Sequence, residues 1–266
     1  MTALNITDAD IGEKLRGKSA IVTGGSFGIG LGIVQYLTKC GVRVLNGDIK
    51  DPSEEVKGVL FQKTDAVSWE DQLALFKKGV ELFGRIDIVV PNAGFRDRGD
   101  YLDYKDSIGN LLKPEFACLK VTLIGQMYTV KLAMHNMRNQ YPQGSVIVST
   151  VKAFLNHTPT WNVRINLIAP HVTDTALLRS VPNLIPGLIR FGILVSTVEE
   201  TARATAFLAA IEDYNGSTIS IMGSEYRELE IGVERHKRDV MGNDPRFNMT
   251  PEQKEVIKNI FAPVSK

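Results

Sequence analysis

The sequence has few of the residues that build disulfide-stapled or metal-bound folds. Among 266 residues there are 2 cysteines and 4 histidines, and Cys40 and Cys118 lie outside any CxxC spacing. This usage argues against a disulfide framework or a structural zinc site and fits a reducing compartment, so we expect a cytoplasmic protein. No apolar run reaches the roughly 18 residues of a membrane span. The first residues also lack the basic and apolar regions of a signal peptide.

An excess of charge of either sign is missing as well. The chain has 31 Lys and Arg against 30 Asp and Glu, a formal net charge of +1. Such a balance provides no overall field that would steer the protein to nucleic acid or to an anionic membrane. We therefore expect neither nucleic acid nor a membrane as a partner. The length suits one large α/β domain or two small ones.

Short apolar runs alternate with longer helical patterns along most of the chain. The runs over 19–23, 86–90 and 145–149 are rich in β-branched residues, which is typical of strands buried on both faces. Residues 28–40 and 111–138 carry apolar side chains at helical spacing. The alternation predicts an α/β fold with a Rossmann-type, doubly wound parallel sheet of about seven strands.

Two segments stand apart from this alternation. Residues 181–198 are apolar but interrupted by prolines and a glycine, which predicts a flap over a site. A threonine followed by proline at 250–251 predicts the start of a short helix. We therefore expect a single domain over residues 1–243 and a helical extension over residues 244–266.

A glycine-rich turn joins the first of these strands to the first helix, and reads Thr23-Gly-Gly-Ser-Phe-Gly-Ile-Gly30. Glycines there let backbone N–H groups and the positive end of the helix approach a phosphate. Asp48 follows at the end of the next predicted strand, where a carboxylate can bind a ribose 2′-hydroxyl and repel a 2′-phosphate. The pair predicts a dinucleotide site that favours NAD, and the nearby Arg43 and Lys50 leave NADP open.

In this form the turn resembles the TGxxxGxG motif of the short-chain dehydrogenase/reductase family. Other motifs of that family follow in order: Asp65 after the third predicted strand (59–63), Asn92-Ala-Gly94 after the fourth (86–90), and Pro170–Thr175, which resembles the PGxxxT segment. The resemblance covers roughly residues 16–225. It implies hydride transfer between a nicotinamide cofactor and an alcohol or ketone, and thus a small-molecule substrate as the partner. It also implies cofactor contacts at Gly24, Ser26, Gly28, Ile29, Gly30, Asp48, Asp65, Asn92, Gly94 and Thr175.

The four catalytic residues of that family, Asn, Ser, Tyr and Lys, are matched only in part. Thr122 stands at the asparagine position, and Thr150, or alternatively Ser149, stands at the serine position, where a hydroxyl can hold the substrate oxygen. The Tyr-x-x-x-Lys motif should follow, but Asn162 leads directly into the next predicted strand. We predict that the chain lacks this pair and the helix that carries it. Because that helix builds the family's usual dimer interface, its loss puts a homo-oligomer in doubt.

Three interpretations are open at this point. The chain is an oxidoreductase acting on a small or medium hydrophobic alcohol or ketone, with another group transferring the proton. Alternatively, it is a redox-inactive relative that keeps the nucleotide site as a binding module. A third interpretation is a truncated gene model or splice form, from which a segment with the tyrosine and lysine has been omitted.

Overall fold

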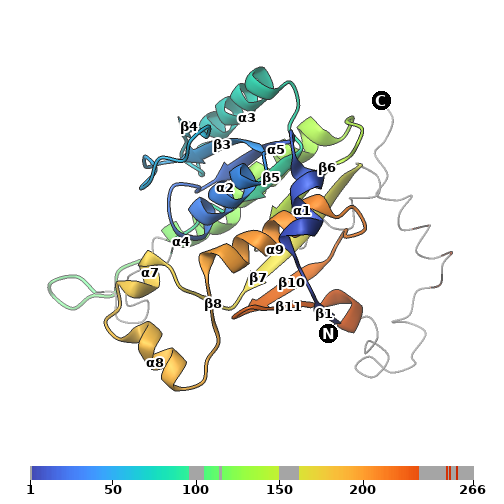
Figure 1. Ribbon diagram of the computed structural model, residues 1–266. Coiled ribbons are helices and arrows are strands. Elements are labelled where there is room, and N and C mark those ends of the chain that lie inside the picture. The colour runs from blue at the N-terminus through green and yellow to red at the C-terminus, as the bar shows by residue number, and fades with distance from the viewer. Residues whose placement is uncertain are drawn as a thin grey trace.

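The computed structural model describes residues 2–95, 105–113, 116–149 and 162–233, together with Thr250, Glu252 and Val256. In these residues a nine-stranded sheet lies at the centre, with helices on both of its faces (Figure 1). The strand order is β1-β11-β10-β7-β6-β5-β2-β3-β4. The strands are β1 (Thr2–Leu4), β2 (Ser19–Thr23), β3 (Arg43–Asp48), β4 (Leu60–Lys63), β5 (Ile88–Pro91), β6 (Gly144–Val148), β7 (Val163–Pro170), β10 (Thr218–Met222) and β11 (Glu225–Glu228).

Neighbouring strands from β4 across to β10 pair in parallel. This confirms the predicted doubly wound sheet. β11 and β1 extend it by an antiparallel edge that the sequence did not predict. Because the parallel strands all run the same way, their carboxyl ends meet at one edge.

The segments that connect the strands of the sheet are mostly helical. Two short strands, β8 (Val172–Thr173) and β9 (Val195–Ser196), form a separate parallel pair. The helices are α1 (Asp8–Leu15), α2 (Gly28–Lys39), α3 (Trp69–Phe83), α4 (Ala117–Leu119), the π-helix η1 (Lys120–Gly125), α5 (Gln126–Met137), α7 (Ala176–Arg179), α8 (Leu184–Arg190) and α9 (Val198–Ala210).

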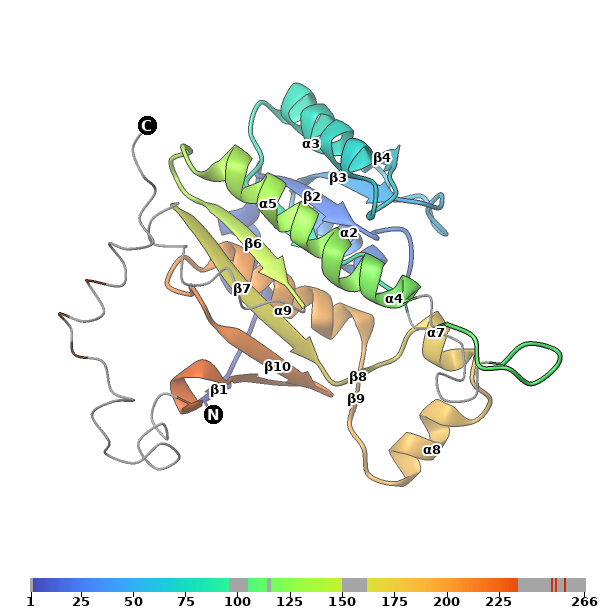
Figure 2. The same ribbon diagram turned by 180° about the vertical axis from the view of Figure 1, so that it is seen from behind.

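Alternate side chains of the strands enter two separate cores. Ala20 and Val22 of β2 pack with α2 and α9, whereas Ile21 between them packs with α3 and α5. The two helical layers are seen on opposite sides of the sheet in Figures 1 and 2. Strands that are apolar on both faces, as here, belong in the middle of such a sandwich.

The amino-terminal helix α1 is fastened to two other helices by one carboxylate. Asp8 accepts a hydrogen bond from the Tyr36 hydroxyl of α2 and forms ion pairs with Lys39 of α2 and Arg203 of α9. Ile11 of the same helix is fully buried in the core. The first residues of the described chain are thus part of the domain.

The expected single helix over 111–138 is wrong at its start. Leu111 lies in a loop, where it bridges to Lys105, and helical structure begins at Ala117 after Phe116 in the left-handed conformation. A proline at position 114 disfavours helical geometry in the residue before it, which accounts for the later start.

Two predictions concern segments that are largely outside the described residues. The crossover from β6 to β7 includes residues 150–161, so the expected loss of a helix there stays a prediction. Of the expected extension over 244–266, the structure describes Thr250, Glu252 and Val256, and the last two are helical.

Candidate functional site

The carboxyl edge of the sheet brings the predicted cofactor residues together. In the parallel registers, Thr23 at the end of β2 lies beside Gly47 of β3 and beside Pro91 of β5. The glycine turn starts at Thr23, Asp48 directly follows Gly47, and Asn92 directly follows Pro91. Residues separated by dozens of positions in the sequence therefore form one crevice, where ligands of open α/β sheets bind.

The glycine turn is packed closely on the protein except near the start of α2. A Cβ on Gly24, whose φ is +69°, would lie 2.7 Å from Ala93 Cα, and one on Gly30 would lie 2.0 Å from the Gly24 carbonyl oxygen. A Cβ on Gly28 would meet only the Thr175 side chain, at 3.8 Å. The space at the start of α2 is thus open to a ligand.

The start of α2 also leaves hydrogen-bond donors for an anion. Its N-cap residue, Phe27, gives no side-chain hydrogen bond to the helix. The first N–H groups of a helix have no partner inside it, and together with the helix dipole they favour a phosphate. An apolar N-cap costs stability because it lacks the hydrogen-bond acceptor that serine or aspartate would offer to the first N–H groups of the helix. A bound anion at this end would supply that acceptor.

Asn92 fastens the turn to the neighbouring strand. Its side-chain amide donates to the Gly24 carbonyl at 2.9 Å, and its backbone N–H donates to Thr23 Oγ1 at 3.2 Å. The Ala93 N–H donates to the same hydroxyl at 3.3 Å. The predicted cofactor residue Asn92 therefore holds the shape of the turn with its amide nitrogen.

Asp48 lies at the edge of this turn with its carboxylate oriented by two N–H groups. Ser26 N donates to Oδ2 at 3.0 Å and Lys50 N donates to Oδ1 at 3.2 Å. Asp48 is partly exposed, whereas Ser26 is fully buried. Each carboxylate oxygen can accept a further hydrogen bond, so Asp48 can still bind a hydroxyl.

Thr175 and Asp65 complete the rim of the crevice. Thr175 caps α7, accepting from Leu178 N at 3.5 Å, with its methyl group toward Gly28. Asp65 lies just beyond β4, the neighbour of β3, and its Oδ1 accepts from Val67 N at 3.0 Å. Both predicted residues thus lie on the same edge as the glycine turn.

Comparison with known proteins identifies the chain's relatives. The sequence model of the short chain dehydrogenase family matches residues 18–161. The chain belongs to this family. A short-chain dehydrogenase/reductase of Acremonium egyptiacum, ascJ, is 34% identical over 267 residues, which cover 88% of this chain and 87% of the relative. An NADP-dependent dehydrogenase of Cochliobolus lunatus, clz5, is 34% identical over 148 residues, which cover 51% of each chain.

A solved structure agrees with the fold of this chain. The crystal structure of gox2181 superposes with a TM-score of 0.66 at 22% identity, covering 79% of this chain and 96% of that chain. At this identity the likeness supports the architecture and not the choice of substrate. The predicted family and fold are both confirmed.

Near the family's asparagine position the helix geometry is unusual. Thr122 lies in the π-helical turn η1, and a Cβ on Gly94 would be 3.2 Å from its hydroxyl. One turn earlier, the Cys118 thiol donates to the Phe95 carbonyl at 2.7 Å. π-turns inside helices are often found at functional sites. Nothing in the sequence indicated the π-turn or the contact with Gly94; the sequence indicated only that Thr122 stands at the asparagine position.

The catalytic assignments lie at the limit of the described residues. Ser149 is exposed directly after β6, at the carboxyl edge, and Thr150 is outside the described residues. The prediction that no Tyr-x-x-x-Lys spacing occurs in the chain is wrong, because Tyr101 and Lys105 have it. They stand between β5 and α4, whereas the family's motif follows β6. Lys105 is exposed at the base of the loop over 105–113, which projects from the body of the molecule (Figure 2).

The predicted flap over residues 181–198 contains α8 and β9 and runs into the start of α9, and its action as a flap stays a prediction. β8 and β9 pair at the two ends of the segment that carries α7 and α8. Large apolar side chains on that segment are exposed, among them Ile189, Phe191 and Leu194.

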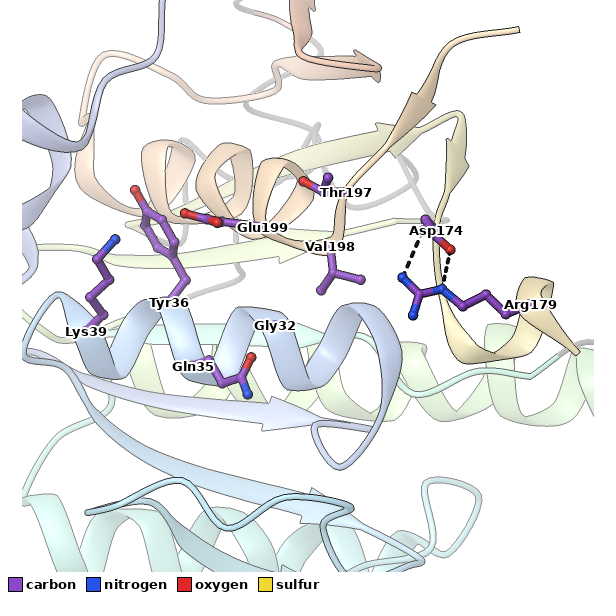
Figure 3. Close-up of a pocket in the computed structure, with 9 residues that line it drawn as sticks. All are labelled: Gly32, Gln35, Tyr36, Lys39, Asp174, Arg179, Thr197, Val198 and Glu199. Carbon is purple, nitrogen blue, oxygen red and sulfur yellow. Dashed lines mark hydrogen bonds and ion pairs between the residues drawn. The ribbon is translucent and has the colours of Figure 1, made fainter. Parts of the chain in front are cut away.

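A separate pocket of about 500 Å³ lies between α2 and the start of α9 (Figure 3). It contains none of the predicted site residues, although Asp174, paired there with Arg179, directly precedes Thr175. Its charged side chains are already in ion pairs, so we do not assign it a ligand. The lining residues are Gly32, Gln35, Tyr36, Lys39, Asp174, Arg179, Thr197, Val198 and Glu199.

Within the described ranges, no group of three or more His, Cys, Asp or Glu side chains could hold a metal ion. In the same ranges no helix has the length and apolar character needed to cross a membrane.

Proposed function

We propose that this short-chain dehydrogenase binds NAD(H) in the crevice at the carboxyl edge of its sheet. The observation that carries the proposal is the pairing of an uncapped helix start at Gly28 with an oriented carboxylate at Asp48. The first would hold the pyrophosphate by backbone N–H groups, and the second would accept from the adenosine ribose.

The carboxylate also favours NAD over NADP. A 2′-phosphate beside Asp48 would bring two negative charges together, which is unfavourable unless a cation lies between them. The relative from Cochliobolus lunatus is named as NADP-dependent. Arg43 begins β3 at the opposite edge of the sheet, where its guanidinium donates to the Phe83 carbonyl. Lys50 is exposed just beyond the end of β3, and NADP therefore stays the second choice.

For the reaction, the proposal follows the family: hydride transfer between the nicotinamide and an alcohol or ketone. The bound cofactor would supply the hydride chemistry, while the chain would bind and orient the substrate and exclude water. The Thr150 hydroxyl, or that of Ser149, would hold the substrate oxygen. The exposed apolar side chains of the segment that carries α7 and α8 support a small or medium hydrophobic substrate.

A second candidate is a nucleotide-binding protein without turnover. It is favoured because no Tyr-x-x-x-Lys follows β6, and β7 begins at Val163. The alignment with ascJ is 267 positions long but includes only 88% of this chain's 266 residues. It therefore has more positions than residues of this chain, so some ascJ residues have no counterpart in this chain. Loss of a general acid/base typically lowers the rate by 10²–10⁴-fold.

Two measurements test these candidates in turn. NADH fluorescence titration of the purified chain tests the binding site, and absence of saturable binding would refute both candidates. A turnover assay over a panel of hydrophobic alcohols and ketones then separates them. Sequencing the genomic DNA between the codons for Asn162 and Val163 tests whether a coding segment has been omitted. An in-frame segment with Tyr-x-x-x-Lys would make the full-length product a complete family member.

A further inference from the structure

A buried amide lies beneath the glycine turn. Asn46, in β3, is 1% exposed and points to the α2 side of the sheet, on the same side of its strand as the apolar Val44. An amide in such surroundings is costly unless its polar atoms are hydrogen-bonded. Its partners therefore indicate why an asparagine stands at a position suited to valine.

Both ends of the Asn46 amide bind the glycine turn. Its Oδ1 accepts from Gly25 N at 3.0 Å, and its Nδ2 donates to Ser26 Oγ at 3.0 Å. The Ser26 hydroxyl in turn donates to the Lys50 carbonyl at 2.9 Å. A Cβ on Gly25 would lie 2.5 Å from Asn46 Oδ1, so the amide fits closely against the turn.

The same network orients the carboxylate at the end of β3. With its hydroxyl held by Asn46 and Lys50, Ser26 directs its backbone N–H at Asp48 Oδ2, at 3.0 Å. A hydrogen bond to a charged acceptor is stronger than one between neutral groups. Asp48 is thereby held against the turn, where its charge faces the space that a 2′-phosphate would enter.

We propose that Asn46 is a positioning residue that sets the preference for NADH over NADPH by holding Ser26 against Asp48. The inference rests on the proposed NAD(H) site. Without the amide, Ser26 keeps its hydrogen bonds to Lys50 and Ser53 but loses the contact that fixes it from below. Its N–H is then less firmly directed at Asp48, and the carboxylate can swing toward solvent. The loss weakens the contact to the ribose hydroxyl and reduces the repulsion of a 2′-phosphate, so the two affinities converge.

The test compares Asn46→Ala with Val44→Ala, a substitution in the same strand, on the same side and with the same 1% exposure. Fluorescence titrations give the dissociation constants for NADH and NADPH, and thermal melting gives stability. We expect both variants to lose stability. The NADPH-to-NADH ratio of dissociation constants should fall about tenfold in Asn46→Ala, the effect of one charge-assisted hydrogen bond, and stay unchanged in Val44→Ala. Asn46→Ser replaces Asn46→Ala if the latter does not fold.

Each outcome decides the matter. An unchanged ratio in the Asn46 variant, or an equal change in both variants, would show a structural role only. A wild-type chain that binds both nucleotides equally would also overturn the inference while leaving dinucleotide binding intact. A wild-type chain that binds neither would overturn the proposed function, and this inference with it.

Discussion

Substitution of Gly30 by alanine tests how closely the glycine turn is packed. A Cβ there would lie 2.0 Å from the Gly24 carbonyl oxygen and 2.4 Å from the Asn92 amide nitrogen. Carbon–oxygen contacts in proteins are about 3.3 Å or longer, so the turn or the helix must move by about 1 Å.

The expected cost follows from three contributions. Alanine gains about 1 kcal/mol of helix propensity over glycine. Overpacking costs about 1–3 kcal/mol, and loss of the Asn92–Gly24 hydrogen bond about 1 kcal/mol more. We expect the free energy of unfolding to fall by about 2 kcal/mol and NADH affinity to fall at least about tenfold, because the N–H groups at the start of α2 shift.

Urea unfolding and NADH titration measure the two effects. Gly12→Ala is the matched control, since Gly12 is also helical, in α1, and a Cβ there would meet nothing within 4 Å. It should gain about 0.5–1 kcal/mol and bind NADH unchanged. A Gly30→Ala variant with wild-type stability and affinity would refute the close packing of the turn.

Three further predictions concern the fold and the reaction. From inside β7 the Arg164 guanidinium donates to four carbonyls at the end of α9 and in the turn after it, those of Leu208, Ala209, Ile211 and Tyr214. Arg164→Met should therefore lose about 3–5 kcal/mol in urea unfolding, whereas the exposed Arg138→Met loses little. Equal unfolding midpoints for the two variants would contradict this. The Tyr36 hydroxyl and Arg203 lower the pKa of Asp8 to about 2, below its ordinary value of about 3.9. The contribution of Asp8 to stability is therefore present above pH 4 and lost as pH falls toward 2; Asp8→Asn should flatten acid unfolding curves in that window, and an unaltered curve would argue against the cluster. Thr150→Ala should lower any turnover about tenfold or more at unchanged NADH affinity, whereas equal turnover would favour Ser149 as the substrate ligand.

The sheet and the cofactor crevice follow from local signals in the sequence. β-branched runs bounded by glycine mark β2, β5 and β6, because strands buried on both faces leave a continuous apolar run. The glycine turn and Asp48 could be placed together, because consecutive parallel strands end at one edge.

Other features depend on tertiary contacts and have no local signal. β1 is three residues long and forms only by pairing with β11. Asn46 reads as an ordinary strand residue until its amide is seen beneath the glycine turn. The π-turn at Lys120–Gly125 has no characteristic sequence, and nothing in the structure explains it apart from its place beside Gly94.

The most direct test of the account is calorimetric titration of Asp48→Asn, which keeps the shape of the side chain and removes its charge. We predict that NADH affinity falls about tenfold and that NADPH affinity rises, because the acceptor for the ribose hydroxyl is weakened and the repulsion of the 2′-phosphate is gone. Unchanged affinities for both nucleotides would contradict a cofactor site at this carboxylate.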